Sequence, residues 1–332
     1  MGKNGQKKTF DTCIDESLYY CHSRRLRPKT MASYEQALRL FERWIREQKG
    51  LERPCEVTEQ TVRHYICDLQ ERGKYSFCIC DRAKATNLPE RRRDYRTPIS
   101  VTTINNYLRN LRAFFNWYEE RESGRNPMEK VKLLSNERAP REYLEDMEVK
   151  KLLDSLDKSY FSENRDRTII LLILDTGMRL GECLKLSMEH VDMHERAISI
   201  PAELTKGRKA RCVYFSMKTA KAMQQWLRFK DRYVESSYIF PTKESGMPLE
   251  LRSFESNFRR YVMRCGIKKE ISPHALRNNF AKRCILAGMD IYTLSRILGH
   301  SSVTVTEKAY LDLTDQDIKR CYQNFSPVEN MM

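Results

Sequence analysis

The sequence contains no run of eighteen consecutive apolar residues, which excludes a helix long enough to span a membrane. Its first eight residues, MGKNGQKK, are mostly polar and lack the apolar stretch of a secretory signal peptide, so we expect none. No internal repeat is visible. Acidic residues are the scarcer charged class, with 45 Asp and Glu against 60 Lys and Arg, so the net charge is +15. This surplus favours a polyanionic partner over the plain alternative of a soluble basic protein.

Patterns typical of disulfide frameworks and metal sites are also missing. The eleven cysteines are an odd number and lie scattered, mostly among apolar residues, which is typical of free thiols in a reducing cytoplasm. Cys78 and Cys80, with Cys67 or His64, form a candidate zinc set, but their spacing differs from the Cys-x2-Cys knuckle. No cluster of carboxylates suited to magnesium is present. We therefore expect neither a metal nor another cofactor.

The chain is long enough, at 332 residues, for about two domains with their own cores. Residues 1–9 are predicted to be a disordered tail, and residues 10–132 a small domain of four helices. A polar, charged linker over residues 133–142 then leads to a second domain over residues 143–332. The four helices are expected over Phe10–His22, from a cap at Thr30 to Gly50, from a cap at Thr58, and from a cap at Thr102 or Thr103.

Residues 73–100 fit this scheme poorly because they are long for a connection between two helices. They contain Pro89, Pro98 and a run of three arginines over residues 91–93. We interpret the segment as a basic surface loop that contacts a nucleic-acid backbone or a neighbouring protomer.

The second domain is predicted to be mainly helical, with a small β-hairpin. A buried helix ends at the break Asp175-Thr176-Gly177, and Arg179 follows directly. The hairpin pairs Ala197–Ile200 with Arg211–Phe215 and has a basic tip at its turn. Further elements are expected at 218–233 (helix), 238–240 (short strand) and 254–265 (helix).

The segment from Ser272 to Leu313 carries the chemistry-bearing residues. In SPHALR, Ser272 is a candidate helix cap, Pro273 suits the first helical position, and His274 and Arg277 share one face of the first turn. The N-terminal end of a helix attracts anions, so this turn suits a phosphate. His300 follows a second helix that stops at Gly299, and Tyr310 lies ten residues further on. The alternative is that His274 and Arg277 lie on an ordinary solvent-exposed helix face and bind no phosphate.

Together these side chains suit the attack of a hydroxyl on a phosphodiester. Arginine forks neutralise the non-bridging oxygens, a lysine on a flexible hairpin gives the leaving 5′-oxygen its proton, and a phenol is a possible nucleophile. Such a site needs no metal, and a tyrosyl phosphodiester conserves the energy of the broken bond. The roles fall to Arg179 and Arg277 (phosphate binding), Lys206, with Lys209 as its possible substitute (general acid), Tyr310 (nucleophile), His274 (base) and His300 (hydrogen-bond donor to the phosphate).

The order Arg, Lys, His-x-x-Arg, His, Tyr resembles that of the tyrosine recombinases, or phage-type integrases. The resemblance covers roughly residues 10–325. It rests on DTGMRLGECLKL (175–186), LTKGRKARCV (204–213), SPHALRNNFA (272–281) and LGHSSVTVTEKAY (298–310).

The resemblance implies a mainly α fold with a small hairpin or sheet: a SAM-like helical core-binding domain followed by a tyrosine-recombinase catalytic domain, in a C-shaped clamp on DNA. It implies a 3′-phosphotyrosyl intermediate, a Holliday junction and a tetrameric synapse. It also makes Glu182 a support for the arginine region, although a plain surface glutamate is an equal alternative. The last helix, capped by Thr314 and presenting Ile318, Tyr322 and Phe325, is then expected to dock into the next protomer.

The implied partner is double-stranded DNA with inverted-repeat core sites, and an accessory directionality factor is the further partner that the resemblance suggests. The layout is similar to the compact Xer type, so binding to separate arm-type sites is not expected. We expect a cytoplasmic, nucleoid-associated bacterial enzyme that moves a mobile element, with Xer-type dimer resolution, a non-catalytic DNA-binding regulator and a type IB topoisomerase-like activity as alternatives.

Two sets of polar residues in the first domain are candidates for DNA contact. One is the basic turn before the second helix, and the other is the polar face of the fourth helix, which can reach phosphates or base edges. For the helix, a solvated surface is again the commoner alternative. The sets are Arg24, Arg25, Arg27 and Lys29, and Asn105, Asn106, Arg109 and Arg112.

Overall fold

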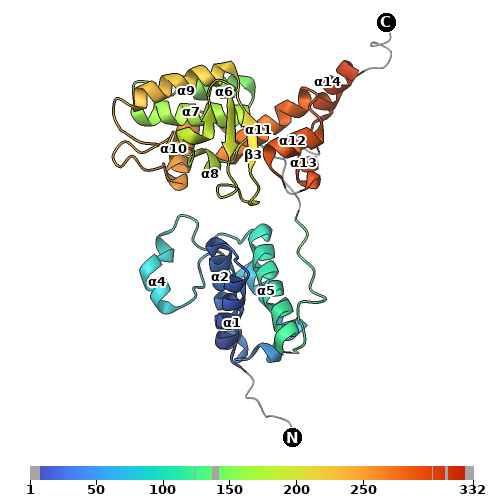
Figure 1. The fold of residues 1–332 in the computed structure, drawn as a ribbon. Helices are drawn as coiled ribbons and strands as arrows, with labels where there is room; N and C mark the ends of the chain where they lie inside the picture. The colour runs from blue at the N-terminus through green and yellow to red at the C-terminus, as the bar shows by residue number, and fades with distance from the viewer. Residues whose placement is uncertain (1–7, 123, 137–141, 301, 311–312, 326–332) are drawn as a thin grey trace. The chain divides into compact units, whose positions relative to one another are not determined.

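The computed structural model describes residues 8–122, 124–136, 142–300, 302–310 and 313–325, with the backbone alone at 83, 84, 305, 308–310, 320, 321 and 323–325. The chain divides into two compact units, Met1–Arg138 and Ala139–Met332. Each has its own apolar core, and the two cores share no residue. The fold is mainly helical with one small sheet (Figure 1), as the sequence predicts.

The first unit is a bundle of four helices with one short additional helix. An aromatic centre holds it together, in which Phe41 and Phe115 are fully buried and Phe10 stacks on Phe114 with ring centroids 5.2 Å apart. Aromatic pairs of this kind add to the free energy gained from burying their area. The helices are α1 (Phe10–Ser23), α2 (Pro28–Lys49), α3 (Glu59–Glu71), α4 (Asp81–Asn87) and α5 (Val101–Glu122).

Helix ends in this unit follow capping rules in most places. Gly50 closes α2 with φ +65°, and Thr58 caps α3 through the backbone N–H of Thr61. The predicted cap at Thr30 is wrong, because α2 begins at Pro28, whose ring favours the first helical turn. The cap expected at Thr102 or Thr103 lies at Ser100 instead, whose Oγ accepts from the N–H of Thr103.

The second unit contains a three-stranded antiparallel sheet and the helices that pack around it. The strands, in the order β1-β2-β3, are β1 (Val191–Asp192), β2 (Ala197–Ile200) and β3 (Arg211–Tyr214), and Ile198 pairs with Val213. One sheet face is buried and α7 packs with α9 and α11 (Figure 1). The helices are α6 (Asp146–Asp154), α7 (Phe161–Thr176), α8 (Leu180–Cys183), α9 (Met217–Lys230), α10 (Leu251–Arg264), α11 (Pro273–Leu286), α12 (Ile291–Leu298), α13 (Val303–Tyr310) and α14 (Asp315–Phe325).

The hairpin prediction is confirmed by β2 and β3, whereas the strand predicted at residues 238–240 is wrong. Tyr238 makes one isolated bridge to Ser187 and no ladder. Ile239 and Phe240 are fully buried, and the carbonyl of Ile239 accepts from the indole of Trp226 at 2.8 Å. The apolar run at these positions therefore reflects burial as a core connection, a case that apolar content alone does not distinguish from a strand.

Candidate active site

The first turn of α11 carries two of the predicted catalytic residues. Ser272 occupies the N-cap position and Pro273 is the first helical residue, but the Ser272 side chain makes no capping hydrogen bond. His274 is exposed, whereas 96% of the surface of Arg277 is buried, since its exposed fraction is 4%. This turn therefore presents an imidazole to solvent and directs a guanidinium into the interior.

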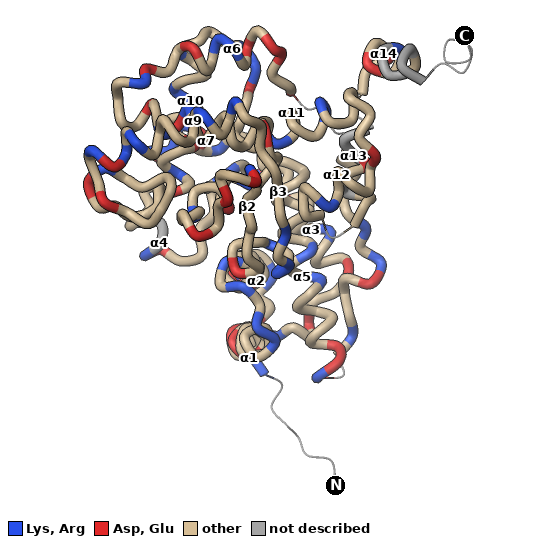
Figure 2. The backbone as a smooth tube through the Cα atoms, turned by 45° about the horizontal axis from the view of Figure 1, so that its top comes forward, with Lys and Arg blue, Asp and Glu red and all other residues tan. Residues whose placement is uncertain are grey.

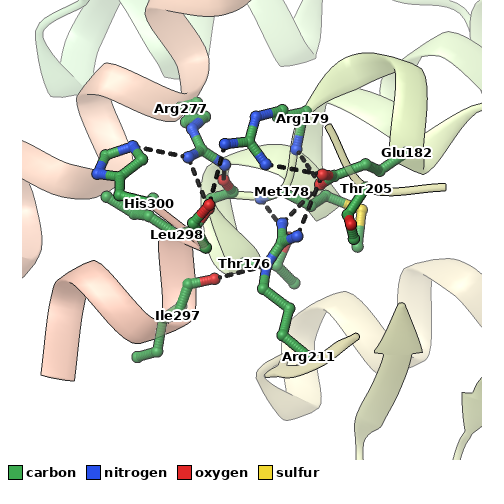
Figure 3. A network of polar contacts seen from close by, with 12 residues as sticks. Thr176, Met178, Arg179, Glu182, Thr205, Arg211, Arg277, Ile297, Leu298 and His300 are labelled. Atoms are coloured by element: carbon green, nitrogen blue, oxygen red, sulfur yellow. Dashed lines mark hydrogen bonds and ion pairs between the residues drawn. The ribbon is translucent and has the colours of Figure 1, made fainter. Parts of the chain in front are cut away.

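The C-terminal end of α12 gathers three guanidinium groups (Figure 3). The carbonyls of three consecutive residues, Ile297, Leu298 and Gly299, each accept from a different arginine. The last carbonyls of a helix have no partner within it and lie at the negative end of its dipole, so they stabilise cations. The donors are Arg211 Nε at 2.9 Å, Arg277 Nη2 at 2.7 Å and Arg179 Nη2 at 3.1 Å.

Arg277 is held from two sides by backbone. Its Nη1 donates to the carbonyl of Gly177 at 2.7 Å, in addition to the bond from Nη2 to Leu298. Burial, and then the nearby charges of Arg179 and Arg211, lower the pKa of Arg277 to about 9. The group is still protonated at neutral pH, and desolvation strengthens its attraction for an anion.

Arg179 and Glu182 form one unit at the start of α8. The Glu182 carboxylate accepts from the Arg179 backbone N–H and from its Nη1, both at 2.9 Å. Glu182 has an exposed fraction of 2% and the Arg179 side chain one of 28%, so a solvent-exposed glutamate does not describe this site. The fixed carboxylate thus orients the most accessible of the three guanidinium groups.

Arg211, the first residue of β3, is a member of the network that the sequence interpretation missed. Its Nη1 and Nη2 donate to the two oxygens of Glu182 at 3.1 and 2.5 Å, while Nε donates to Ile297 (Figure 3). Burial alone would raise the pKa of Glu182, but the hydrogen bonds and charge of Arg211, aided by Arg179, hold it below its ordinary value. In the sequence, the only feature that could have indicated Arg211 is its place as a basic residue on a strand just after a basic turn, and this is a weak indication.

His300 is neutral, and both of its ring nitrogens have partners. Nε2 lies 2.9 Å from Arg277 Nη2, and Nδ1 lies 2.7 Å from Thr306 Oγ1. A guanidinium only donates, so Nε2 accepts and the proton is assigned to Nδ1, facing Thr306. Burial, followed by the charges of Arg277, Arg179 and Arg211, lowers the pKa of His300 to about 4. Donation of a hydrogen bond from His300 to a phosphate remains a prediction. It requires the ring to replace its hydrogen bond to Arg277 or to Thr306 by one to the phosphate.

The two hairpin lysines differ in their surroundings. Both are exposed in the connection between β2 and β3, and the backbone N–H of Lys209 donates to Thr205 Oγ1 at 3.1 Å. Lys209 is one of the residues that line a cavity of about 580 Å³, together with Arg211, Arg296 and His300, whereas Lys206 does not line it. The choice between the two lysines as general acid remains a prediction.

Tyr310 is the last residue of α13, and its side chain lies outside the part of the chain that the structure describes. The helix itself is tied to the site because Thr306, four residues earlier, is fully buried against His300. Phe325 of the last helix likewise lies outside the described side chains, whereas Thr314 caps α14 through the N–H of Asp317.

The basic turn predicted to contact DNA is exposed between α1 and α2. Arg24 ends α1 with its guanidinium 5.7 Å from the ring centroid of Tyr20, Arg25 has φ +56°, and Arg27 occupies the N-cap position of α2. Lys29 lies in the first turn of that helix and is exposed as well.

The second predicted set divides into two pairs. Asn105 is buried, where its side chain accepts from the N–H of Leu134 and donates to its carbonyl, and Arg112 Nη2 donates to the carbonyl of Val131 at 2.5 Å. The expectation that these two side chains lie on an outward polar face is therefore wrong, because the segment after α5 covers them. Asn106 and Arg109 are exposed and hydrogen-bonded to each other at 2.8 Å.

Within the described residues, no group of three or more His, Cys, Asp or Glu side chains is arranged to hold a metal ion, and this includes the set around Cys78 and Cys80. None of the described helices combines the length and the apolar character needed to cross a bilayer.

The chain is similar to known proteins over most of its length. A model of the phage integrase family matches residues 142–317, more than half of the chain. The tyrosine recombinase XerC of Listeria monocytogenes is 27% identical over 323 residues, which cover 93% of this chain and 96% of the relative. The tyrosine recombinase XerD of Shewanella oneidensis is 25% identical over 310 residues, covering 92% and 93%.

Solved structures show the same fold. The Tn1549 transposon integrase, solved with transposon right-end DNA, superimposes with a TM-score of 0.70 at 18% identity and covers 96% of this chain and 99% of that one. The XerH site-specific recombinase, solved with a difH substrate, gives a TM-score of 0.65 at 19% identity and covers 95% and 84%. The protein is a tyrosine recombinase by class. More specifically, the chain belongs to the phage integrase family.

Proposed function

We propose that this protein is a site-specific DNA recombinase that cuts and rejoins DNA through a 3′-phosphotyrosyl intermediate. The observation that carries the proposal is the group of three arginines at the end of α12, ordered by Glu182 and by helix carbonyls. Glu182 neutralises one of the three positive charges, and the surplus positive charge that remains favours a bound anion, so the site suits a phosphodiester.

Arg179 and Arg277 bind the non-bridging oxygens of the scissile phosphate. Arg179 is partly exposed and its Nε has no recorded partner among the described residues, so it approaches the phosphate first. Arg277 supplies a buried charge, whereas Arg211 is already saturated by Glu182 and Ile297 and acts as a positioning residue. Preorganised donors of this kind stabilise the charge of a pentacoordinate transition state without reorganisation.

The reaction is a pair of transesterifications. The Tyr310 oxygen forms a bond to phosphorus as the bond to the 5′-oxygen breaks, and the phenolic proton passes to His274. Lys206 gives a proton to the leaving 5′-oxygen, and the same steps in reverse rejoin the strand. A free phenol has a pKa of ~10, so forming phenolate at pH 7 costs about 4 kcal/mol, a cost that the neighbouring arginines reduce.

The proposed DNA partner carries inverted-repeat core sites, bound by four protomers that pass through a Holliday junction. An accessory directionality factor belongs to the same proposal. The exposed basic turn of Arg24, Arg25, Arg27 and Lys29 supports contact with DNA phosphates. Residues 10–132 are proposed as the core-binding domain and residues 143–332 as the catalytic domain.

Helix α14 is proposed to dock into the next protomer of the tetramer. Ile318 and Tyr322 lie four residues apart on one face and are 54% and 62% exposed, so together they form an uncovered apolar face that a second protomer could cover. The base of the helix is anchored to its own unit by the ion pair between Lys282 and Asp317 at 2.7 Å.

Two biological roles remain candidates. We propose integration and excision of a mobile element, because the basic segment 73–100 exceeds what a simple helix connection needs. The Xer-type relatives favour the alternative, in which the enzyme resolves chromosome or plasmid dimers. The two roles differ in substrate, since a mobile element is flanked by its own sites and a dimer carries two copies of one chromosomal site.

The decisive experiment uses a nicked suicide duplex made from the DNA that flanks the gene, with wild type and Tyr310→Phe compared on a denaturing gel. We expect a covalent protein–DNA band in wild type that is absent in the variant. A band that survives in Tyr310→Phe would assign the nucleophile to another residue. Binding to its own site without any band would favour the regulator. On a supercoiled plasmid that carries the site, relaxed circles without recombinant junctions would favour the topoisomerase-like activity.

A further inference from the structure

Residues 73–97 form a closed loop whose two ends are joined by backbone. The N–H of Lys74 donates to the carbonyl of Thr97 at 2.8 Å, and the N–H of Arg96 donates to that of Lys74 at 2.9 Å. Gly73 makes this closure possible, because a Cβ there would lie 2.6 Å from the Arg96 carbonyl oxygen. The segment, which includes α4, is therefore a closed structural unit and not an open linker.

The loop is fixed to the helical bundle through an aromatic ring between two cations. The guanidinium of Arg72 lies 4.9 Å from the ring centroid of Phe77, and that of Arg43 lies 5.5 Å from it. Arg43 also pairs with Asp81 at 2.9 Å and donates to the carbonyl of Cys78. Cation–π contacts of this kind anchor the loop at α2 and α3 and hold its shape before any partner binds.

The backbone of the loop is strained. Tyr75, Leu88 and Arg96 have φ values of +60°, +41° and +58°, and they are three of the six non-glycine residues with positive φ in the described chain. Each left-handed residue of this kind costs on the order of 1 kcal/mol or more, and such strain concentrates at functional sites.

The outer surface of the loop is basic. Residues 73–100 contain seven Lys and Arg against three Asp and Glu, a surplus of four positive charges. Figure 2 colours the Lys and Arg positions of the described chain blue. Lys74 pairs with Asp94 and Arg92 lies 4.5 Å from the ring centroid of Tyr75. Arg91 and Arg93 are exposed, and no ion pair or hydrogen bond is recorded for either side chain among the described residues.

We propose that this loop is a preorganised clamp for the DNA backbone, in which Arg91 and Arg93 bind phosphates beyond those contacted by the helical bundle. The inference rests on the proposed function only in taking DNA as the polyanion. Arginine forks suit phosphate oxygens, and the rigid loop loses little conformational entropy on binding. A second copy of the chain would present the same positive loop, so its charge opposes self-association through this surface.

The proposal is tested with Arg91→Gln/Arg93→Gln, and with Lys221→Gln/Arg228→Gln as a control of equal charge change. Lys221 and Arg228 are exposed on α9, and no partner is recorded for them in the described part of the chain.

Binding to a 60-base-pair duplex (roughly six helical turns) is measured by fluorescence anisotropy between about 0.05 and 0.2 M salt, with Tyr310→Phe in every chain so that the DNA stays intact. We expect the loop variant to reduce the slope of log K against log salt by about two and to raise Kd by about one to two orders of magnitude at 0.1 M salt. We expect the control to change both much less.

An unchanged slope of log K against log salt in the loop variant would overturn the proposal. An equal loss of DNA affinity in the control would also overturn it, because the effect would then come from net charge alone. Loss of self-association without DNA, measured by sedimentation, would assign the loop to protein contact and would also overturn it. Thermal unfolding of both variants should match the parent. The suicide-duplex reaction of the wild type, with Tyr310 present, is a separate test, because a missing covalent band there would count against the proposed function and not against the loop.

Discussion

Arg211 is the single side chain on which the order of the active site most depends. It joins the strand that follows the hairpin turn, the acid that orients Arg179, and the end of α12. Removing one member of a buried ion pair costs about 3–5 kcal/mol when the remaining charge is left without a partner. Glu182 keeps its two hydrogen bonds from Arg179, so we expect a cost at the lower end of this range. Arg211→Met should therefore lower the free energy of unfolding by about that amount and abolish the covalent band, with DNA binding retained.

A double-mutant cycle with Glu182→Gln separates positioning from general damage. We expect Arg211→Met/Glu182→Gln to be more stable in urea than the sum of the single changes predicts, because no buried carboxylate is left without Arg211. Arg211→Lys should recover part of the stability but little of the cleavage, since one ammonium cannot bridge both oxygens of Glu182 and Ile297. Additive single effects, or full cleavage by the lysine variant, would contradict this role.

His300 makes a pH-dependent contribution to stability. Its pKa falls from an ordinary value of 6.5 to about 4 in the folded protein. Between these values the unfolded chain binds the proton and the folded protein does not, so stability is highest above pH 6.5 and decreases as the pH falls towards 4. The full effect is on the order of 3 kcal/mol. Urea unfolding across this range should show a steeper pH dependence in wild type than in His300→Asn.

The exposed His194 is the matched control for this prediction, because its side chain is 94% exposed. His194→Asn should leave the difference between pH 4 and pH 7 nearly as large as in wild type. Equal pH dependence in wild type and His300→Asn would show that His300 is not held neutral.

At the scale of elements, the turn between α7 and α8 positions the arginines. Gly177 has φ +64°, and a Cβ there would lie 2.3 Å from the Phe280 ring and 2.9 Å from Leu298. Its carbonyl also accepts from Arg277. Gly177→Ala should therefore cost the ~1 kcal/mol of a left-handed alanine plus a steric term of about 1–3 kcal/mol, and it should displace Arg277.

Gly266 provides the comparison for Gly177, since it has φ +65° and nothing lies within 4 Å of the Cβ position. Chemical denaturation of the two alanine variants isolates the steric term, because the backbone strain is shared. We expect Gly177→Ala to be the less stable of the two and to lose the covalent band, whereas Gly266→Ala keeps it. Equal free energies of unfolding would mean that Phe280 and α12 move aside for the added methyl group without a loss of stability.

For the whole molecule, two separate cores predict two unfolding transitions. Phe41 is fully buried in the core of residues 10–131, and Trp226 is fully buried in the core of the second unit. Replacing either by alanine costs about 3–5 kcal/mol within its own core. Calorimetry should therefore show Phe41→Ala lowering one transition and Trp226→Ala the other. If either substitution lowers the temperature of a single transition that includes both units, the two units unfold cooperatively as one.

Local patterns were sufficient wherever a feature depends on a few neighbouring residues. The caps at Thr58, Gly50 and Gly299, the buried helix faces and the hairpin follow from periodicity and from which residues tolerate φ > 0°. The order of the catalytic motifs also identified the family before any contact was known. The caps and helix faces depend on residues within one or two turns, where spacing fixes proximity, whereas the family was identified from the order of motifs along the chain.

What the sequence alone determined is therefore most of the helices, though not α4, together with the hairpin, the charge and the class of enzyme. Tertiary structure alone decided which polar groups meet: Arg211 binds an acid 29 residues away, Arg179 a carbonyl 120 residues away, and Asn105 turns inward to a segment 29 residues on. Sequence spacing carries no information on such contacts, because they depend on how separate elements pack. The same packing buries Arg277 and neutralises His300, since desolvation and neighbouring charge set both pKa values.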